Sequence, residues 1–206
     1  MVISAPPPPP PRERRGYHVH DGFYLRIGGG LGLGLGSVSS DSKKINDFEI
    51  GGAGADLNCW IGGTPTPGIA MGGLISYHGI QDGSVEVDGN ETEQSLNATL
   101  AMLGFFVDVF PDPQRGLHFG GSLGLAGMRT NGHSNDLMEA PLNAPDYDGG
   151  GLGVSAWIGY MGFVGPEWSL GGMLQMTGAI TGKEEDGIKR QGSAGVLSLS
   201  LTALYH

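Results

Sequence analysis

A stretch of alternating glycines near the N-terminus constrains the fold more than any other feature of the sequence. Between Gly22 and Gly36, apolar side chains take alternate positions, and glycine takes most of the positions between them. Such period-two alternation is typical of a β-strand with two unlike faces. A helix is excluded because each interior glycine costs about 1 kcal/mol relative to alanine. The apolar face of this predicted strand consists of Phe23, Leu25, Ile27, Leu31, Leu33 and Leu35.

The same alternation recurs along the chain and predicts eight strands in total. At the C-terminus the apolar face consists of Leu197, Leu199, Leu201, Ala203 and Tyr205. Six further segments of this kind lie between the two ends, at about 48–62, 69–80, 98–110, 117–129, 151–164 and 168–181. The parity of the second strand slips near Gly51 to Gly54, which predicts a β-bulge there.

The connections between the predicted strands alternate in length. Short turns with proline or glycine lie at 64–67, 111–115 and 165–167, and long polar loops lie at 37–47, 81–97, 130–150 and 182–192. An even number of antiparallel strands places both chain ends on the side of the short turns and every long loop on the other side. Outer-membrane barrels have this asymmetry, with short periplasmic turns and longer extracellular loops.

The two strand faces favour lipid over water around the barrel. A soluble eight-stranded barrel points its apolar face inward, and five alternate glycines would leave a hole in such a core. In a membrane barrel the glycine face borders a polar lumen, which large side chains such as Trp60 and Trp157 can fill. The apolar face carries no charge at mid-depth, since Glu49 and Arg129 lie near loop ends. We therefore predict an all-β fold: an eight-stranded antiparallel up-and-down transmembrane β-barrel over residues 22–206.

Composition excludes several classes of protein. The 206-residue chain has 11 basic and 21 acidic residues, and its net charge of −10 argues against a nucleic-acid partner. The single cysteine, Cys59, excludes an intramolecular disulfide framework and a cysteine-based zinc site, and it falls on the apolar face of its strand. Residues 1–21 contain six consecutive prolines and no apolar signal segment, so we expect a stiff periplasmic tail, with a signal removed or encoded upstream.

Two terminal motifs resemble a known family. The C-terminal alternation leads to the aromatic Tyr205, as in the assembly signal of small eight-stranded outer-membrane β-barrel proteins of Gram-negative bacteria, the OmpA-like and OmpX-like class, although His206 adds one residue. The opening Asp21-Gly22-Phe23-Tyr24-Leu25-Arg26 is similar to a first strand of this class. The resemblance implies an integral outer-membrane protein of the cell envelope, with outer-membrane lipid, lipopolysaccharide and the barrel-assembly machinery as partners. It also assigns a membrane girdle and assembly signal to Phe23, Leu197, Leu199, Leu201 and Tyr205.

No residues in the sequence form a convincing catalytic constellation. His133, Ser134 and Asp136 are sequence neighbours in a polar loop, which favours a solvated segment over a catalytic triad, because spacing alone does not reveal triad geometry. We therefore expect no enzymatic activity and no cofactor. A metal site at the short-turn rim stays open as an alternative, on the histidines that barrel closure would bring together: His18, His20 and His206.

Acidic residues are concentrated in two of the predicted long loops. Loops 81–97 and 130–150 hold nine acidic residues and no basic residue. Oxygen-rich loops can bind Ca²⁺ or Mg²⁺, but the segment from Asp88 lacks the glycine and the glutamate of a calcium loop. A solvated, repulsive acidic surface is favoured, with metal binding as the alternative on Asp82, Glu86, Asp88, Asp146 and Asp148.

A buried ion pair is predicted inside the lumen. If the first two strands form a hairpin centred near residue 42, Arg26 lies opposite Asn58 and diagonal to Asp56. A lone guanidinium in the barrel would be costly without a carboxylate. We therefore predict an Arg26–Asp56 pair, with Asp108 as a second possible partner across the narrow lumen.

These features favour a non-enzymatic envelope protein with a structural, adhesive or protective role through its acidic surface loops. A narrow diffusion channel is an alternative, although eight strands leave too little width for the wide channel of a porin. A lipid-modifying outer-membrane enzyme and a soluble binding barrel also stay open.

Overall fold

The computed structural model describes residues 19–20, 22–41, 47–87, 90–132, 146–185 and 187–205. It contains eight long strands, one for each predicted segment, and most of them extend beyond the predicted limits. Their bounds are β1 Gly22–Ser40, β2 Phe48–Thr66, β3 Ile69–Val87, β4 Asn90–Val109, β5 Leu117–Gly132, β6 Tyr147–Phe163, β7 Trp168–Glu185 and β8 Ile188–Tyr205. The described part of the chain contains no helix that is long and apolar enough to cross a membrane.

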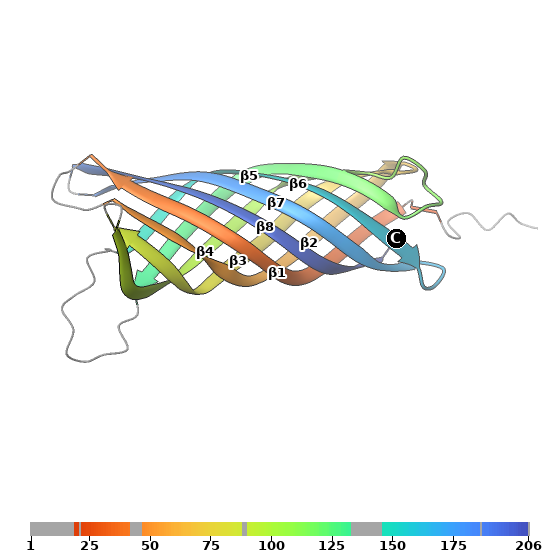
Figure 1. The fold of residues 1–206 in the computed structure, drawn as a ribbon. Helices are drawn as coiled ribbons and strands as arrows, with labels where there is room; N and C mark the ends of the chain where they lie inside the picture. The colour runs from red at the N-terminus through yellow and green to blue at the C-terminus, as the bar shows by residue number, and fades with distance from the viewer. Residues whose placement is uncertain are drawn as a thin grey trace, which may run out of the picture.

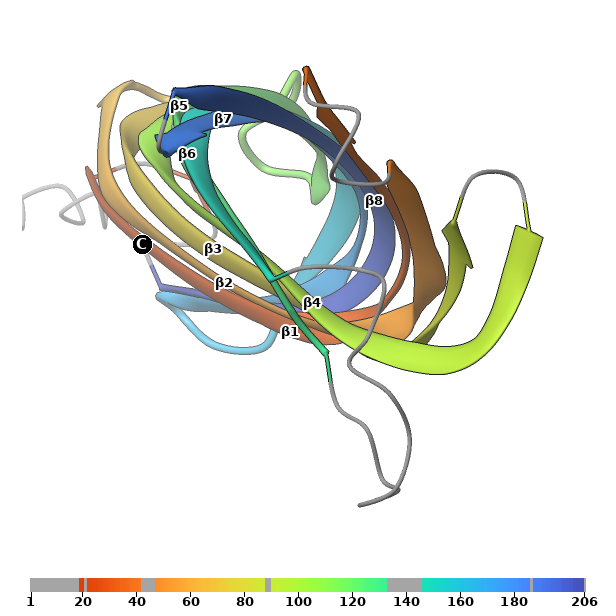
Figure 2. The same ribbon diagram turned by 90° about the vertical axis from the view of Figure 1, so that its left-hand side faces the viewer.

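The eight strands form a closed antiparallel barrel in which every strand pairs with its neighbours in the sequence (Figures 1 and 2). β1 closes the barrel against β8, and Leu25 pairs with Tyr205. The start of β1 and the end of β8 therefore lie at the same end of the barrel. We call this end, with the connections 67–68, 110–116 and 164–167, the short-turn end. The opposite end is the loop end. The predicted all-β fold, a closed eight-stranded antiparallel barrel, is confirmed.

Two of the predicted long loops are mostly continued strands, so their predicted extent is wrong. β3 runs to Val87 and β4 begins at Asn90, while β7 runs to Glu185 and β8 begins at Ile188. Backbone pairing continues through polar residues, for example between Lys183 and Arg190. Polar side chains are tolerated there because the strands extend past the apolar belt. In Figure 2 the ends of β3 and β4 lean away from the barrel mouth.

The outer surface of the barrel is apolar, as predicted, whereas the inner surface is mixed and not polar throughout. On β1 the side chains of Phe23, Ile27, Leu31, Leu33 and Leu35 point outward and are about half to three-quarters exposed. Similar exposed leucines, isoleucines, valines and aromatic residues cover the other seven strands. Because alternate residues of a strand point to opposite faces, the buried side chains between them line the lumen.

The irregularity predicted near Gly51 to Gly54 is present, but its extra residue lies on the partner strand. Gly51 pairs with Ser84 and Gly54 pairs with Ile80. Between these two pairs β3 advances by four residues and β2 by three, so β3 holds one extra residue. The inward-facing parity of β2 continues unbroken through this region, whereas β3 changes parity. The predicted parity slip in β2 is therefore wrong, and the bulge belongs to β3.

Candidate functional site

The glycine stripe on the inner face of β1 allows the neighbouring strands to approach closely. An added Cβ at Gly30 would lie 2.1 Å from the Leu199 carbonyl oxygen and 2.6 Å from the Ser200 Cα. At Gly34 the same atom would lie 2.4 Å from the Ile80 side chain. The space left by these glycines is therefore occupied by side chains from other strands, which meet over β1.

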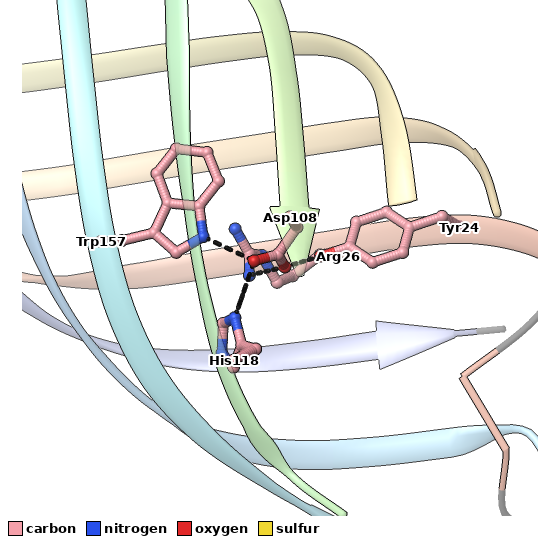
Figure 3. A network of polar contacts seen from close by, with 5 residues as sticks. All are labelled: Tyr24, Arg26, Asp108, His118 and Trp157. Atoms are coloured by element: carbon pink, nitrogen blue, oxygen red, sulfur yellow. Dashed lines mark hydrogen bonds and ion pairs between the residues drawn. The ribbon is translucent and has the colours of Figure 1, made fainter. Parts of the chain in front are cut away.

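A polar network centred on Asp108 fills the lumen near the short-turn end (Figure 3). The Arg26 Nη1 atom donates to Asp108 Oδ2 at 2.8 Å, and the Tyr24 hydroxyl donates to the same oxygen at 2.7 Å. Trp157 Nε1 donates to Asp108 Oδ1 at 2.9 Å. His118 Nδ1 lies 3.0 Å from Asp108 Oδ1 and 3.2 Å from Arg26 Nη1. Four strands, β1, β4, β5 and β6, are thereby connected across the lumen.

The charges in this network are fully removed from solvent. The side chains of Arg26 and Asp108 are both 0% exposed. The Trp60 ring lies 3.9 Å from the guanidinium carbon of Arg26, and Trp157 lies 5.2 Å from it. Cation–π contacts of this kind strengthen when the cation is desolvated. Ion pairing, hydrogen bonding and aromatic stacking together compensate the cost of burying the guanidinium.

The predicted Arg26–Asp56 pair is wrong, and Asp108, the second predicted partner, holds the arginine instead. The β1–β2 register places Arg26 opposite Trp60 and Asp56 opposite Gly30, a shift of two residues from the predicted register. The shift arises because the β1–β2 hairpin is centred slightly later in the chain than its loop suggested. Asp108 reaches Arg26 from β4 because the lumen is narrow.

Aromatic and aliphatic side chains surround the network and close the short-turn end. His20 stacks on Phe110 with ring centroids 3.8 Å apart, and Phe110 stacks on His118 at 5.1 Å. We call the buried residues around Arg26 and Asp108 the short-turn plug. Its apolar members are Tyr24, Trp60, Ala70, Leu74, Phe106, Phe110, Trp157, Met161, Met173 and Leu204.

A second cluster, held together mainly by apolar packing, fills the lumen toward the loop end. We call it the aliphatic plug, although it includes two aromatic residues. It consists of Val38, Phe48, Ile50, Val85, Leu96, Ala98, Leu100, Ala126, Met128, Tyr147, Ala179 and Val196. The sequence analysis expected a polar lumen and missed this cluster. A signal was present, because Phe48 and Ile50 share the parity of the lumen-facing Asp56 and Asn58.

Between the two plugs lies a layer of small polar side chains, which we call the polar layer. On β2, Asp56 and Asn58 lie between Ile50 and Trp60, and the same order occurs on the other strands that contribute to the layer. Its members are Asp56, Asn58, Ser76, His78, Ser155, Gln175, Thr177, Ser198 and Ser200, all buried. A cavity of about 20 Å³ on the loop side of the layer reaches His78 and has room for about one water molecule.

The predicted girdle residues lie on the outer surface at the short-turn end. The Tyr205 ring lies 5.2 Å from Trp168 and 6.2 Å from Phe23, and its hydroxyl donates to Glu167 at 2.8 Å. Aromatic rings with one polar contact suit a membrane interface. The remaining residues assigned to the assembly signal also point outward: Leu197, Leu199 and Leu201.

The acidic residues proposed as metal ligands do not form a cluster where they are described. Glu86 is exposed, and Asp148 pairs with Arg129 at 3.0 Å. The Asp146 carbonyl accepts a hydrogen bond from Arg190. Among the residues that the structure describes, no group of three or more His, Cys, Asp or Glu is placed to hold a metal ion. Outside the described set are Asp88, the side chain of Asp82, and His18, His133, Ser134, Asp136 and His206.

Basic and acidic side chains are both present at the end of the β7–β8 hairpin. Lys183 Nζ lies 2.8 Å from Glu185 Oε2, and this hydrogen bond lowers the pKa of the exposed Glu185 carboxyl. Lys183 and Arg190 are register partners, as are Glu184 and Lys189. This rim carries both signs of charge, unlike the acidic segments of β3 and β4.

Solved structures share the architecture, although no protein-family model and no curated protein matches the chain. The outer membrane protein OprG from Pseudomonas aeruginosa aligns over 92% of this chain and 99% of its own, with 11% identity and a TM-score of 0.53. The fold is that of the small outer-membrane β-barrels. Neisserial surface protein A aligns over 89% of this chain and 96% of its own, with 13% identity and a TM-score of 0.46. A major outer membrane protein from Thermus thermophilus shows 16% identity over 86% of this chain and 98% of its own, with a TM-score of 0.43.

Proposed function

We propose that the protein is a non-enzymatic outer-membrane barrel with a closed lumen, which anchors an acidic surface at the loop end. The observation that carries the proposal is the filling of the lumen at two levels. The short-turn plug contains two tryptophans and a buried ion pair, and the aliphatic plug contains twelve buried residues. Solutes crossing the barrel would have to displace both.

The alternative of a narrow diffusion channel needs a continuous polar path. Eight-stranded barrels have an interior that side chains can fill. Here the polar layer lies between the two plugs. The buried polar side chains at the level of the aliphatic plug are few and are engaged by Tyr147, whose hydroxyl contacts Thr181 at 2.9 Å and whose backbone amide donates to the Thr130 hydroxyl. The closed barrel therefore favours a structural, adhesive or protective role over transport.

The proposed orientation places both termini in the periplasm and the loop end outside the cell. The longest connection between strands, residues 133–146, lies at the loop end and supports it, because outer-membrane barrels turn tightly on the periplasmic side. The exposed carboxylates of Glu86 and Asp148 then belong to the surface that meets external partners. The outward leucines of β8 and Tyr205 support outer-membrane lipid, lipopolysaccharide and the barrel-assembly machinery as partners.

Conductance in planar bilayers tests the closed lumen. The purified protein should insert without producing current steps, since buried side chains fill the lumen at both plugs. A matched variant with the aliphatic plug thinned, Phe48→Ala with Leu96→Ala, should also fail to conduct because the short-turn plug remains. Regular current steps from the unmodified protein would favour the channel.

Epitope accessibility on intact cells tests the orientation. An epitope at Asn90 should be labelled and one at Gln114 should not; the reverse pattern would overturn the topology. Envelope lipids from cells with and without the protein should have equal masses. A mass shift would favour the lipid-modifying enzyme.

A further inference from the structure

Asp56 is a buried carboxylate whose hydrogen-bond partners in the described part of the chain are all neutral. Ser200 Oγ lies 3.0 Å from both of its oxygens, and Ser198 Oγ lies 3.4 Å from Oδ2. Asn58 Nδ2 also donates to Oδ2. The contact with Ser200 passes over Gly30, which pairs with both residues and has no side chain to separate them. The side chain of Asp56 is thus held rigidly, at 1% exposure, in the middle of the lumen.

No basic side chain in the described part of the chain forms an ion pair with this carboxylate. Arg26 is engaged by Asp108, which leaves the short-turn plug with one full charge of each sign. Arg190, the other buried arginine, lies beyond the aliphatic plug, where it donates to the Asp146 carbonyl and lies 5.2 Å from the Tyr147 ring. An isolated ionised carboxylate in such surroundings is very costly unless an opposite charge joins it or it takes up a proton.

Several oxygen atoms in the same layer have no hydrogen-bond partner among the residues that the structure describes. They are Asn58 Oδ1, Ser76 Oγ and Gln175 Oε1, and both ring nitrogens of His78 are also unpartnered. Strand register places these groups together. Asn58 pairs with Ser76, Asp56 pairs with His78, and Gln175 pairs with Ser198, which contacts Asp56. All four side chains are at least nine-tenths buried and face the lumen.

We propose that the polar layer binds one monovalent cation of the sodium type, held by the Asp56 carboxylate and neighbouring amide and hydroxyl oxygens. Carboxylate, amide and hydroxyl oxygens are ligands of hard cations. A single carboxylate matches a single positive charge and leaves the layer neutral. A divalent ion would leave an excess positive charge in the closed lumen. The binding site is independent of the proposed surface function.

Because plugs lie on both sides of the polar layer, the cation should enter as the barrel folds. The experiment therefore refolds the full chain into detergent micelles in sodium chloride, potassium chloride or choline chloride at equal concentration and pH. The thermal midpoint of unfolding is then measured in the same salt. We expect a midpoint several degrees higher in sodium than in choline, which is too large for the layer, since a ligand that binds only the folded state stabilises it.

Two variants separate the site from general salt effects. Asp56→Asn should lose the sodium dependence and should be at least as stable as the unmodified protein in choline, because no charge remains to be neutralised. Glu86→Gln, which removes an exposed carboxylate, should keep the full sodium dependence. If Asp56→Asn does not fold, Gln175→Met should weaken the sodium dependence instead.

Equal midpoints of the unmodified protein in sodium and choline would overturn the proposal, whatever their dependence on pH. A sodium dependence that persists in Asp56→Asn would also overturn it, because the ion would then act elsewhere.

Discussion

The two ends of the lumen are closed by different chemistry, although the same strands form both. The short-turn plug depends on directional contacts, in which one carboxylate receives donors from an arginine, a tyrosine and a tryptophan. Most members of the aliphatic plug are held only by apolar packing. The short-turn plug should therefore lose stability when the partner of a buried charge is removed. The aliphatic plug should lose stability when a cavity is created.

The largest effect is expected for Arg26→Met in the short-turn plug. The substitution leaves the buried Asp108 carboxylate without its cation, which should lower the free energy of unfolding by about 3 to 5 kcal/mol. Urea unfolding from lipid vesicles measures the change. Arg115→Met is the matched control, since its pair with Asp112 is exposed and should contribute at most about 1 kcal/mol.

Double-mutant cycles distinguish the two carboxylates of the lumen. Arg26→Met combined with Asp108→Asn should show coupling well above about 0.5 kcal/mol, because each residue contacts the other directly. The cycle of Arg26→Met with Asp56→Asn should show markedly weaker coupling. Equal coupling in the two cycles would contradict the observed pairing.

Leu96→Ala tests the aliphatic plug. Leu96 is buried, so the substitution should lower the free energy of unfolding by about 3 kcal/mol. The loss combines the transfer free energy of the removed atoms with the cost of the cavity that they leave. Leu201→Ala is the control, because Leu201 is 79% exposed on the outer surface, where lipid can fill the gap. A larger loss in urea unfolding for Leu201→Ala than for Leu96→Ala would show that packing does not hold the loop end together.

Gly30→Ala should have a smaller effect, of about 1 to 3 kcal/mol. Its Cβ would meet the backbone of β8, which must shift to admit it. Gly73→Ala, on the outer face of β3, has no atom within 4 Å of the added Cβ and should be close to neutral. Equal urea midpoints for both variants would mean that the close approach over β1 is not needed.

Tyr205→Ser should change the stability of the folded barrel least, because its hydroxyl contact with Glu167 is at the exposed rim. Its effect should instead appear during assembly in cells, where the terminal aromatic belongs to the predicted signal. The amount of heat-modifiable, folded barrel in the envelope should fall several-fold for Tyr205→Ser and little for His206→Ser. Similar amounts of folded barrel for the two variants would show that Tyr205 is not part of an assembly signal.

Strand number and strand faces were predictable from the sequence because they depend on period-two alternation. Outward residues such as Leu31 and Leu199 must be apolar, whereas inward positions admit glycine, serine or tryptophan. The ends of the strands were not predictable in the same way. Beyond the apolar belt, as at Lys183 and Arg190, backbone pairing continues without any pattern in the side chains.

The candidate site was predictable only in part. Lumen parity identified Arg26, Asp56 and Asp108 as inward-facing, but the choice of partner depended on a register that shifts by two residues with the centre of one hairpin. Contacts across the lumen depend on barrel closure, which local sequence does not encode. The pairing of Arg26 with Asp108 and the hydrogen bond between Asp56 and Ser200 over Gly30 are of this kind.

Fluorescence quenching of the three tryptophans tests the closed, apolar-outside barrel most directly. Trp60 and Trp157 lie in the short-turn plug, while Trp168 is 48% exposed on the outer surface. In lipid vesicles, a Trp168→Phe variant retains only the two lumen tryptophans, and brominated lipid and aqueous acrylamide should both quench them weakly. The Trp60→Phe/Trp157→Phe variant retains only Trp168, which brominated lipid should quench strongly. Strong acrylamide quenching of the lumen tryptophans would show an open lumen and contradict the closed barrel.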